Sequence, residues 1–314
     1  MRVVFLGTPE FALRSLEALV ASRYEVAAVF TQPDRPAGRG QRPTASAVKR
    51  YAVSAGLVVH QPNKIRAEEN RALLETLRPD FLVVVAYGQI LPRWLLELPA
   101  VAPVNVHASL LPRYRGAAPV AWALIHGDTV TGCTTMLMEE TLDTGPILLQ
   151  RSLPIGLETN CGELERELAA LGAELLVPTL DGLAAGKIYP RPQDAARAVA
   201  APKITKEMAA VDWASPAPEI HDRVRAFNPW PLAHAPFRGE RLIVARTLPV
   251  AESDQGGGGG EGTVLAVTAN ALRVRCGGAS VLDLLEVQLP GRKRISGREL
   301  ASGARLAPGD VLGR

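Results

Sequence analysis

Short apolar runs alternate with longer amphipathic segments through the first half of the chain. The run Arg2 to Leu6 predicts a buried strand, and the segment from Pro9 to Val20 carries apolar residues at helical spacing. The same pattern predicts further strands at residues 25–31, 57–60, 81–86, 101–106, 131–138 and 147–155, and helices at 45–55, 67–77, 117–126 and 160–185. Such alternation is typical of an α/β fold with a Rossmann-like, mostly parallel sheet that has helices on both faces.

The pattern changes after the long helix. Residues 186–206 are rich in proline and basic side chains, as in an inter-domain linker. Beyond a helix at 218–226, short strand-like runs separated by turn residues are typical of a smaller all-β, OB-like barrel: 242–247, 262–267, 271–275 and 281–287. We expect three parts: a catalytic domain at 1–188, a linker at 189–206 and a barrel domain at 207–314. The glycine run Gly256 to Gly260 is interpreted as an inserted hairpin tip without chemistry of its own.

Composition excludes several classes of protein. The chain has 314 residues, 47% of them hydrophobic and 21% charged, with a formal net charge of +3, as in a soluble globular protein. No apolar run approaches the roughly 18 residues of a membrane span, so we expect no membrane segment, and the scattered cysteines fit a cytoplasmic protein. The three cysteines lack metal-ligand or disulfide spacing, and only Gly7 stands where a dinucleotide fingerprint needs three glycines. We therefore expect no metal and no nicotinamide or flavin cofactor.

The candidate chemistry begins at the end of the strand expected at 101–106. Asn105 and His107 are two residues apart, so a strand directs both side chains to one face. Pro112 then ends the extended segment and starts a loop. Ligands in parallel α/β sheets bind outside the carboxyl ends of the strands, where His107 is expected. A single histidine at a strand end is more often structural, so spacing alone leaves both interpretations open.

The run from His107 to Gly116 resembles the signature of the folate-dependent formyltransferases, which move a formyl group from 10-formyltetrahydrofolate to an amine. The resemblance implies that Asn105 and His107 are catalytic. It also implies that the loop residues Ser109, Leu110, Leu111 and Pro112 line the folate site.

A third candidate lies in the stretch Leu142-Asp143-Thr144-Gly145. Asp in such a stretch is by itself usually a turn former. The match to the L-D-T-G stretch of the same family implies that Asp143 is the third catalytic residue. One departure is visible, because Thr141 stands where relatives commonly have glycine.

Basic residues gather in three places outside this candidate site. Between Val29 and Arg50 the chain has five basic residues and one acid, a density suited to phosphate contacts, although a solvated loop explains it equally well. The run Thr31 to Gly40 resembles the loop that reaches the tRNA acceptor arm in the members of this family that act on methionyl-tRNA. The resemblance implies initiator methionyl-tRNA as a partner. The candidate tRNA-binding residues are Arg35, Arg39 and Arg42 in the loop, Lys203 and Lys206 in the linker, and Arg292, Lys293 and Arg294 in the tail.

Formyl transfer to an amine passes through a tetrahedral carbon that bears an oxyanion. Asn105 and His107 are expected to donate hydrogen bonds to that oxygen, while Asp143 orients the imidazole and helps relay a proton. Cys133 and Ser109 lack an evident base beside them, so a covalent enzyme intermediate is disfavoured.

Three functions stay in competition. The first is formylation of the free amino group of methionine on initiator methionyl-tRNA by a monomeric enzyme. The second is a formyltransferase of the same superfamily that acts on a small amine. A glycinamide ribonucleotide enzyme would end near the linker, and an amino sugar nucleotide enzyme would not need the basic loop. The third is a non-catalytic tRNA- or folate-binding module, which the presence of Asn105, His107 and Asp143 disfavours.

Overall fold

A computed structural model gives the structure of the chain at residues 1–37, 42–251 and 259–313. The chain forms two compact units. The first contains Met1–Pro119, Val130–Pro154 and Glu165–Ala201, and the second contains Val120–Thr129, Ile155–Leu164 and Pro202–Arg314. By its contacts, the segment 189–201 of the expected linker therefore belongs to the first unit. Across the described ranges, no helix is long and apolar enough to cross a membrane.

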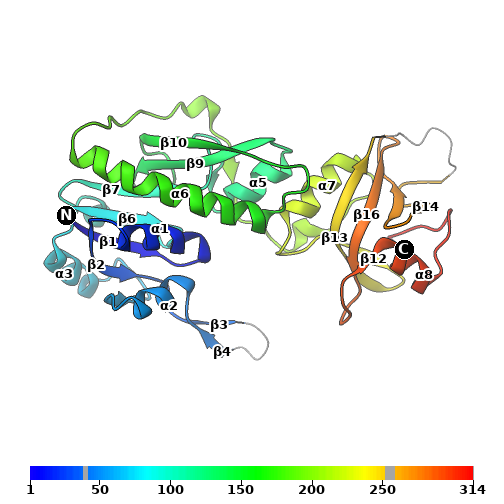
Figure 1. Cartoon of the computed structure of the whole chain (residues 1–314), viewed down its shortest axis with the longest axis horizontal. Helices are drawn as coiled ribbons and strands as arrows, with labels where there is room; N and C mark the ends of the chain where they lie inside the picture. The colour runs from blue at the N-terminus through cyan, green and yellow to red at the C-terminus, as the bar shows by residue number, and fades with distance from the viewer. Residues whose placement is uncertain (38–41, 252–258, 314) are drawn as a thin grey trace. The chain divides into compact units, whose positions relative to one another are not determined.

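The first unit contains a seven-stranded sheet in the order β10-β9-β7-β6-β1-β2-β5 (Figure 1). Neighbouring strands from β5 to β7 are parallel, and β9 and β10 are antiparallel. This confirms the mostly parallel sheet expected from the sequence. The strands are β1 (Arg2–Gly7), β2 (Glu25–Phe30), β5 (Val59–His60), β6 (Phe81–Val85), β7 (Ala102–His107), β9 (Val130–Leu137) and β10 (Ile147–Pro154).

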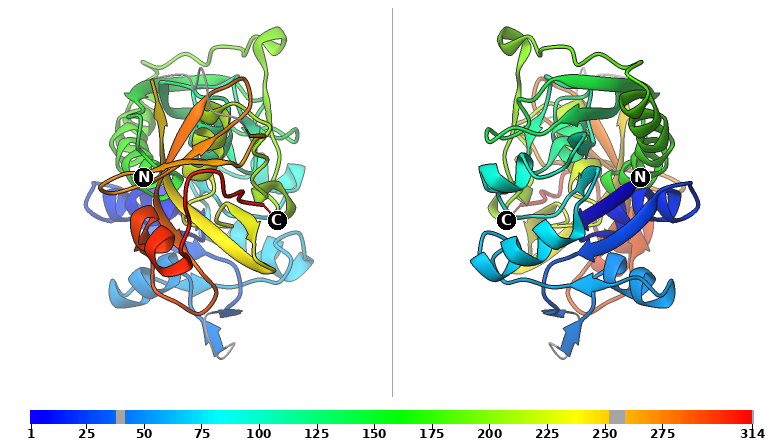
Figure 2. Two further views of the ribbon diagram at one scale, coloured as in Figure 1. Left: turned by 90° about the vertical axis from the view of Figure 1, so that its right-hand side faces the viewer. Right: turned by 90° about the vertical axis from the view of Figure 1, so that its left-hand side faces the viewer.

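Helices cover both faces of this sheet, as the alternating pattern predicts (Figure 2). On one face, residues such as Phe5 and Val104 form a buried cluster with α1 (Glu10–Val20), α2 (Ala47–Ser54) and α6 (Cys161–Ala184). On the other face, residues such as Leu6 and Leu82 pack against α3 (Glu68–Leu77) and α4 (Arg93–Leu96). Strands buried on both faces explain why the sequence shows continuous apolar runs there instead of alternation.

The strand order creates a switch point beside β1. The chain runs from β1 to β2 and β5 on one side, and then returns to place β6 and β7 on the other. Crevices for ligands form where successive connections leave a sheet in opposite directions. Hydrogen bonds join the three segments that follow β1, β2 and β6, because Thr8 Oγ1 and Gln32 Nε2 donate to the Tyr87 carbonyl at 3.3 and 3.0 Å. The carboxyl end of β7 lies at the same edge of the sheet as the carboxyl ends of β1, β2 and β6.

Short elements appear that the sequence pattern does not predict. The basic loop begins and ends in the antiparallel strands β3 (Arg35–Ala37) and β4 (Arg42–Thr44). Two further strands, β8 (Arg115–Gly116) and β11 (Ala200–Ala201), pair in parallel near the end of β7. Two 3-10 turns also lie at Ala195–Arg197 and Glu207–Ala209, whereas α5 (Pro119–Ile125) confirms the helix predicted at 117–126. Arg39 lies outside the described residues.

The second unit has a helix, α7 (Ala217–Ala226), followed by an antiparallel sheet in the order β12-β13-β16-β15-β14, with β17 added at β16. This antiparallel domain fits the expected OB-like barrel. The strands are β12 (His234–Phe237), β13 (Glu240–Val250), β14 (Val264–Val267), β15 (Leu272–Arg275), β16 (Val281–Gln288) and β17 (Ile295–Ser296), and α8 (Gly297–Ala304) follows them. Residues 256–258 of the glycine run lie outside the described residues.

His221 on α7 connects three segments of the second unit. Its Nε2 lies 2.8 Å from the Leu157 carbonyl and its Nδ1 lies 3.0 Å from Thr247 Oγ1. A carbonyl can only accept, so Nε2 carries the proton of the neutral ring and Nδ1 accepts from the hydroxyl. Burial lowers the pKa of His221 below its ordinary 6.5, and this effect outweighs the hydrogen bond to the Leu157 carbonyl, which raises the pKa.

A lowered pKa makes the folded state prefer the neutral ring, so His221 should weaken the fold in acid. Its contribution to stability is complete above pH 6.5 and falls as the pH drops from there toward the lower pKa of the folded state. Thermal unfolding followed between pH 7.5 and 5.5 should show a larger fall in Tm for the native chain than for His221→Gln, by a few degrees at roughly 2–4 °C per kcal/mol. Parallel curves for the two proteins would contradict this assignment.

Candidate active site

The strand β7 brings Asn105 and His107 to one face of the sheet, as their spacing predicts. Val104 and Val106 point into the buried cluster with α1 and α6, so the two polar side chains face the other way. Asn105 pairs with Val84 of β6 and Met136 of β9, and His107 pairs with Thr134 of β9. His107 is buried and Asn105 is half-buried. Within the part of the chain that the structure describes, the Asn105 side chain makes no hydrogen bond, which leaves its amide available to a ligand.

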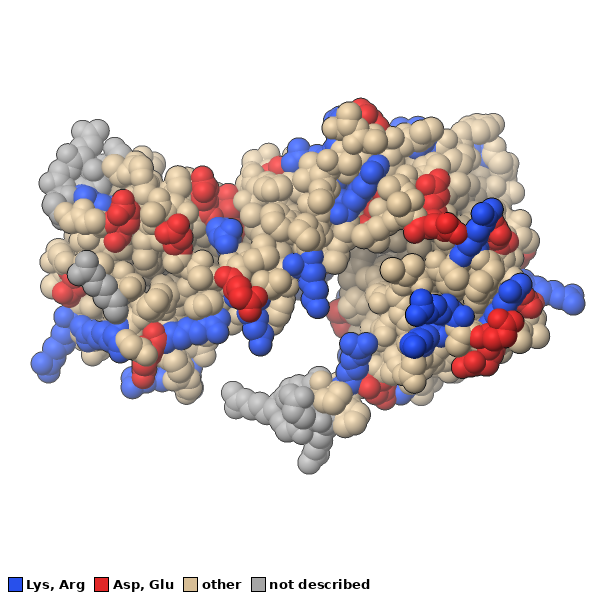
Figure 3. Space-filling view, turned by 180° about the vertical axis from the view of Figure 1, so that it is seen from behind, with Lys and Arg blue, Asp and Glu red and all other residues tan. Residues whose placement is uncertain are grey.

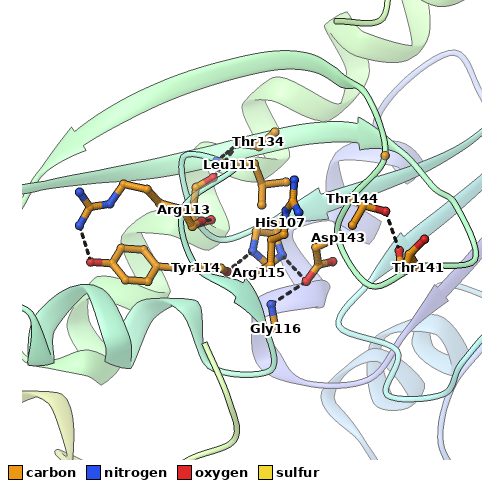
Figure 4. Close-up of polar contacts among 12 residues, drawn as sticks. His107, Leu111, Arg113, Tyr114, Arg115, Gly116, Thr134, Thr141, Asp143 and Thr144 are labelled. Carbon is orange, nitrogen blue, oxygen red and sulfur yellow. Dashed lines mark hydrogen bonds and ion pairs between the residues drawn. The ribbon is translucent and has the colours of Figure 1, made fainter. Parts of the chain in front are cut away.

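The ring of His107 is oriented by a backbone carbonyl. Its Nε2 lies 2.9 Å from the Tyr114 carbonyl oxygen (Figure 4). Because that oxygen can only accept, Nε2 carries the proton in the neutral ring and Nδ1 has a free lone pair. From the sequence we expect His107 to donate a hydrogen bond to the oxyanion, but the neutral ring already uses its only N–H on Tyr114. The ring presents a proton acceptor at Nδ1, and it has a second N–H to donate only once it is protonated.

Tyr114 is held in the conformation that aims its carbonyl at His107. Its φ of +63° lies in the left-handed region, which is uncommon for a residue with a bulky side chain. Its ring is buried, and Arg113 Nη2 donates to the Tyr114 hydroxyl at 2.8 Å while the guanidinium lies 5.0 Å from the ring centroid. Packing and this hydrogen bond offset the backbone strain, which costs about 1–3 kcal/mol at such positions.

Asp143 reaches His107 from the turn between β9 and β10. Its Oδ2 lies 3.7 Å from His107 Nδ1, and it accepts a hydrogen bond of 2.8 Å from the Gly116 amide. Both side chains are buried, at 7% and 6% exposure, so water screens their attraction weakly. The carboxylate thus lies beside the imidazole nitrogen that is not bound to Tyr114. The residues that the family resemblance combines, Asn105, His107 and Asp143, converge at the end of β7.

The expected folate loop is fixed by side chains that sequence reasoning does not identify. Thr134 Oγ1 donates to the Ser109 carbonyl at 2.6 Å and accepts from the Leu111 amide at 3.1 Å. Gln150 Nε2 donates to the Leu111 carbonyl at 2.9 Å. Ser109 and Leu111 are buried, whereas Leu110 and Pro112 are half-exposed and available to line a ligand. Neither Thr134 nor Gln150 belongs to a motif, so only the three-dimensional contacts reveal their part.

Two nucleophiles considered from the sequence have other roles. Cys133 is fully buried, and burial raises the pKa of its thiol to about 12, so it stays protonated near neutral pH. The Ser109 hydroxyl donates to the Arg113 carbonyl at 2.6 Å. Among residues 1–37, 42–251 and 259–313, no three His, Cys, Asp or Glu side chains gather as a metal site would require. The three candidate catalytic side chains are one amide, one imidazole and one carboxylate.

The basic residues named from the sequence lie on the surface. Arg35, Lys203, Lys206, Arg292, Lys293 and Arg294 are exposed. For Arg42 the structure gives the backbone, in β4, and for Arg39 no description. Figure 3 shows Lys and Arg side chains along the lower edge of the second unit, at the left of that view. Such an edge suits contact with a phosphate backbone.

Comparison with known proteins places the chain in a family. The formyl transferase family model matches residues 1–180, and the model of the formyl transferase C-terminal domain matches residues 203–305. The chain belongs to the formyl transferase family. The methionyl-tRNA formyltransferase of Solibacter usitatus is 47% identical over 313 residues, which cover 100% of this chain and 99% of that protein. The methionyl-tRNA formyltransferase of Ectopseudomonas mendocina is 48% identical over 316 residues, with the same coverage.

Solved structures share the fold at much lower identity. A sugar 3N-formyl transferase crystallised in the presence of dTDP and 5-N-formyl-THF aligns with a TM-score of 0.67, 16% identity and coverage of 93% of this chain and 99% of that chain. The N-formyltransferase from Helicobacter canadensis, in complex with folinic acid and dTDP-3-aminofucose, also gives 0.67 and 16%, with coverage of 90% and 98%. At such identity the likeness concerns the fold of the formyltransferases alone.

Gly116 generates a test of this geometry. Its φ is +134°, and a Cβ at this position would lie 2.4 Å from the Ala201 carbonyl oxygen. The Gly116→Ala substitution should therefore displace the amide that binds Asp143 and lower the free energy of unfolding by about 1–3 kcal/mol, measured by denaturant titration. In Gly303→Ala, where a Cβ in α8 meets nothing within 4 Å, stability should stay the same or rise. Equal stabilities for the two variants would refute the close approach at Gly116.

Proposed function

We propose that this chain transfers the formyl group of 10-formyltetrahydrofolate to the amino group of methionine on initiator methionyl-tRNA, giving formylmethionyl-tRNA for translation initiation. The observation that carries the proposal is the buried His107–Asp143 pair beside Asn105, in a chain that matches methionyl-tRNA formyltransferases over its full length. We propose Asn105, His107 and Asp143 as the catalytic residues, and Ser109, Leu110, Leu111 and Pro112 as the lining of the folate site.

The three side chains divide the chemistry. The neutral amine attacks the formyl carbon, and the resulting tetrahedral carbon bears an oxyanion that the Asn105 amide stabilises by donating a hydrogen bond. His107 takes the proton that the attacking nitrogen must lose, at Nδ1, because Nε2 is bound to Tyr114. The Asp143 carboxylate stabilises the imidazolium at a distance of 3.7 Å. Cleavage of the carbon–nitrogen bond to the folate then needs a proton on the leaving nitrogen, which the imidazolium can return.

Two features favour methionyl-tRNA over a small amine. The chain continues beyond the catalytic sheet into a compact second unit, which a glycinamide ribonucleotide enzyme ending near the linker would lack. Exposed basic residues occur in that unit and beside the hairpin strands β3 and β4. We therefore propose that Arg35, Arg39, Arg42, Lys203, Lys206, Arg292, Lys293 and Arg294 bind tRNA phosphates. We also propose a monomeric cytoplasmic enzyme, and the boundaries at 188 and 206 stay predictions.

The direct test compares acceptors. The purified chain is incubated with 10-formyltetrahydrofolate carrying a labelled formyl group and with methionyl-tRNA, glycinamide ribonucleotide or an amino sugar nucleotide. Label should appear on methionyl-tRNA with the highest kcat/KM. Preferential labelling of either small amine would make the alternative function the correct one, and folate binding without transfer to any acceptor would favour a binding module.

Substitution of the catalytic residues should lower turnover without unfolding the protein. Each of Asn105→Ala, His107→Ala and Asp143→Ala should reduce kcat by at least about 100-fold, because each removes a group that acts on the transition state. Asp143→Asn sharpens the test, since an amide oxygen can still accept from Gly116 while the negative charge is gone. Near-native turnover of His107→Ala, with an unchanged Tm, would exclude the assigned role.

Salt should separate the two substrates. If the basic residues bind phosphates, the KM for methionyl-tRNA should rise steeply with salt concentration, and the KM for the folate should change little. Replacing Arg292, Lys293 and Arg294 by Gln should flatten the logarithmic salt slope by about 1 unit for each phosphate contact removed. The matched control replaces Arg14, Arg71 and Arg93, each of which pairs with a carboxylate three or four residues further along the chain. Equal slopes for the native chain and both triple variants would show that the tail does not bind phosphates.

A further inference from the structure

The segment of the chain that comes after α6 is hydrogen-bonded to the loops of the active site within the first unit. At its start, Arg191 and Ile147 exchange two backbone hydrogen bonds of 2.8 Å at the beginning of β10. At its end, Ala200 and Ala201 pair with Arg115 and Gly116 as strands β11 and β8. Residues 191–201, here named the strap, are thus anchored at both ends to segments that adjoin Asp143 and His107. The sequence pattern indicates only a linker in this region.

Gln193 of the strap bonds to the backbone of the Asp143 turn. Its Nε2 donates to the Asp143 carbonyl at 2.8 Å and to the Gly145 carbonyl at 2.7 Å. Its Oε1 accepts from Arg115 Nε at 3.0 Å and from Arg115 Nη2 at 2.8 Å. Both amide hydrogens and the amide oxygen are therefore engaged, and the half-buried side chain has one defined orientation.

These bonds connect the two segments that meet at the catalytic carboxylate. Arg115 precedes Gly116, whose amide donates to Asp143 Oδ2. Gln193 thus connects the backbone of Asp143 to β8, the strand whose Gly116 amide contacts the Asp143 side chain. Asp143 itself has a φ of +54°, a conformation that neighbouring contacts must maintain because the backbone alone disfavours it.

We propose that Gln193 is a positioning residue that holds the Asp143 carboxylate beside His107. The proposal rests on the function given above, in which Asp143 stabilises the imidazolium. Loss of the two donated hydrogen bonds exposes the Asp143 and Gly145 carbonyls to water and lets the turn relax from its left-handed conformation. A displacement of about 1 Å in a catalytic group can cost about 100-fold in rate. Within the described part of the chain, Gln193 makes no hydrogen bond to the residues proposed to bind the folate and tRNA, so we expect both substrates still to bind.

The kinetic test uses Gln193→Ala and Gln193→Glu in the full-length chain. Glu keeps the size and the pairing with Arg115, but it has no hydrogen to donate to the two carbonyls. Both variants should lower kcat about 10- to 100-fold, with less than twofold change in KM for 10-formyltetrahydrofolate or methionyl-tRNA. The matched control is Asp194→Ala, which removes an exposed side chain of the strap that accepts from the Ala196 amide, and it should retain native kcat. A native kcat in both Gln193 variants, or an equal loss in the control, would overturn the proposal.

A double-mutant cycle separates positioning from general destabilisation. If Gln193 acts through the Asp143 carboxylate, Gln193→Ala should change kcat by less than about twofold in the Asp143→Asn background. If the reductions in kcat caused by Gln193→Ala and Asp143→Asn instead multiply in the double variant, Gln193 acts independently of Asp143. The proposal would then be wrong.

A readout without turnover keeps this inference separate from the proposed function. The Gly116 amide donates to the Asp143 carboxylate, so its hydrogen exchange, followed by NMR, reports whether that carboxylate is in place. Exchange at Gly116 should be at least about tenfold faster in Gln193→Ala than in the native chain or Asp194→Ala. Unchanged protection in Gln193→Ala would refute the positioning role. Failure of the native chain to formylate methionyl-tRNA, with Gly116 exchange still responding to Gln193, would refute the substrate assignment alone.

Discussion

The arrangement of the first unit depends on keeping a carboxylate buried beside an imidazole. Charged groups lose hydration on burial and persist only where hydrogen bonds and opposite charge replace it. Asp143 receives the Gly116 amide at 2.8 Å and faces His107, while His107 is tied to the Tyr114 carbonyl at 2.9 Å. Tyr114 and Gly116 belong to the segment that follows β7, and Asp143 belongs to the turn between β9 and β10. The sheet provides a rigid edge, and backbone groups of the loops provide the polar surroundings.

This requirement explains why the backbone is unusual where the site forms. Tyr114, Gly116 and Asp143 all have positive φ, at +63°, +134° and +54°. Such conformations cost free energy, and they persist only where surrounding contacts determine them. The Arg113–Tyr114 contact, the approach of Ala201 to Gly116 and the hydrogen bonds from Gln193 are those contacts. Part of the stabilising free energy of the fold thus offsets the backbone strain of the loops that are held against the end of β7.

The sequence predicts features that arise from local pattern. Apolar runs and helical periodicity predict the alternating strands and helices, and a spacing of two predicts that Asn105 and His107 share a face. Asp143 joins them only through the family resemblance, since no local pattern says where a turn will fold. Gln193, Thr134 and Gln150 leave no signal, because their hydrogen bonds connect residues distant in the chain. The helix α8 differs, because its capping box of Ser296 and Glu299 is a local pattern that is visible in the sequence.

The strap also bears on how the parts of such a chain can be exchanged. A chimera joined directly after α6 would receive the catalytic sheet but would leave behind Gln193 and the β11 strand that lies against Gly116. Recombination between relatives is therefore expected to preserve catalysis only when the junction falls beyond Ala201. The second unit can then diverge freely, while residues 191–201 are inherited together with the loops to which they are hydrogen-bonded.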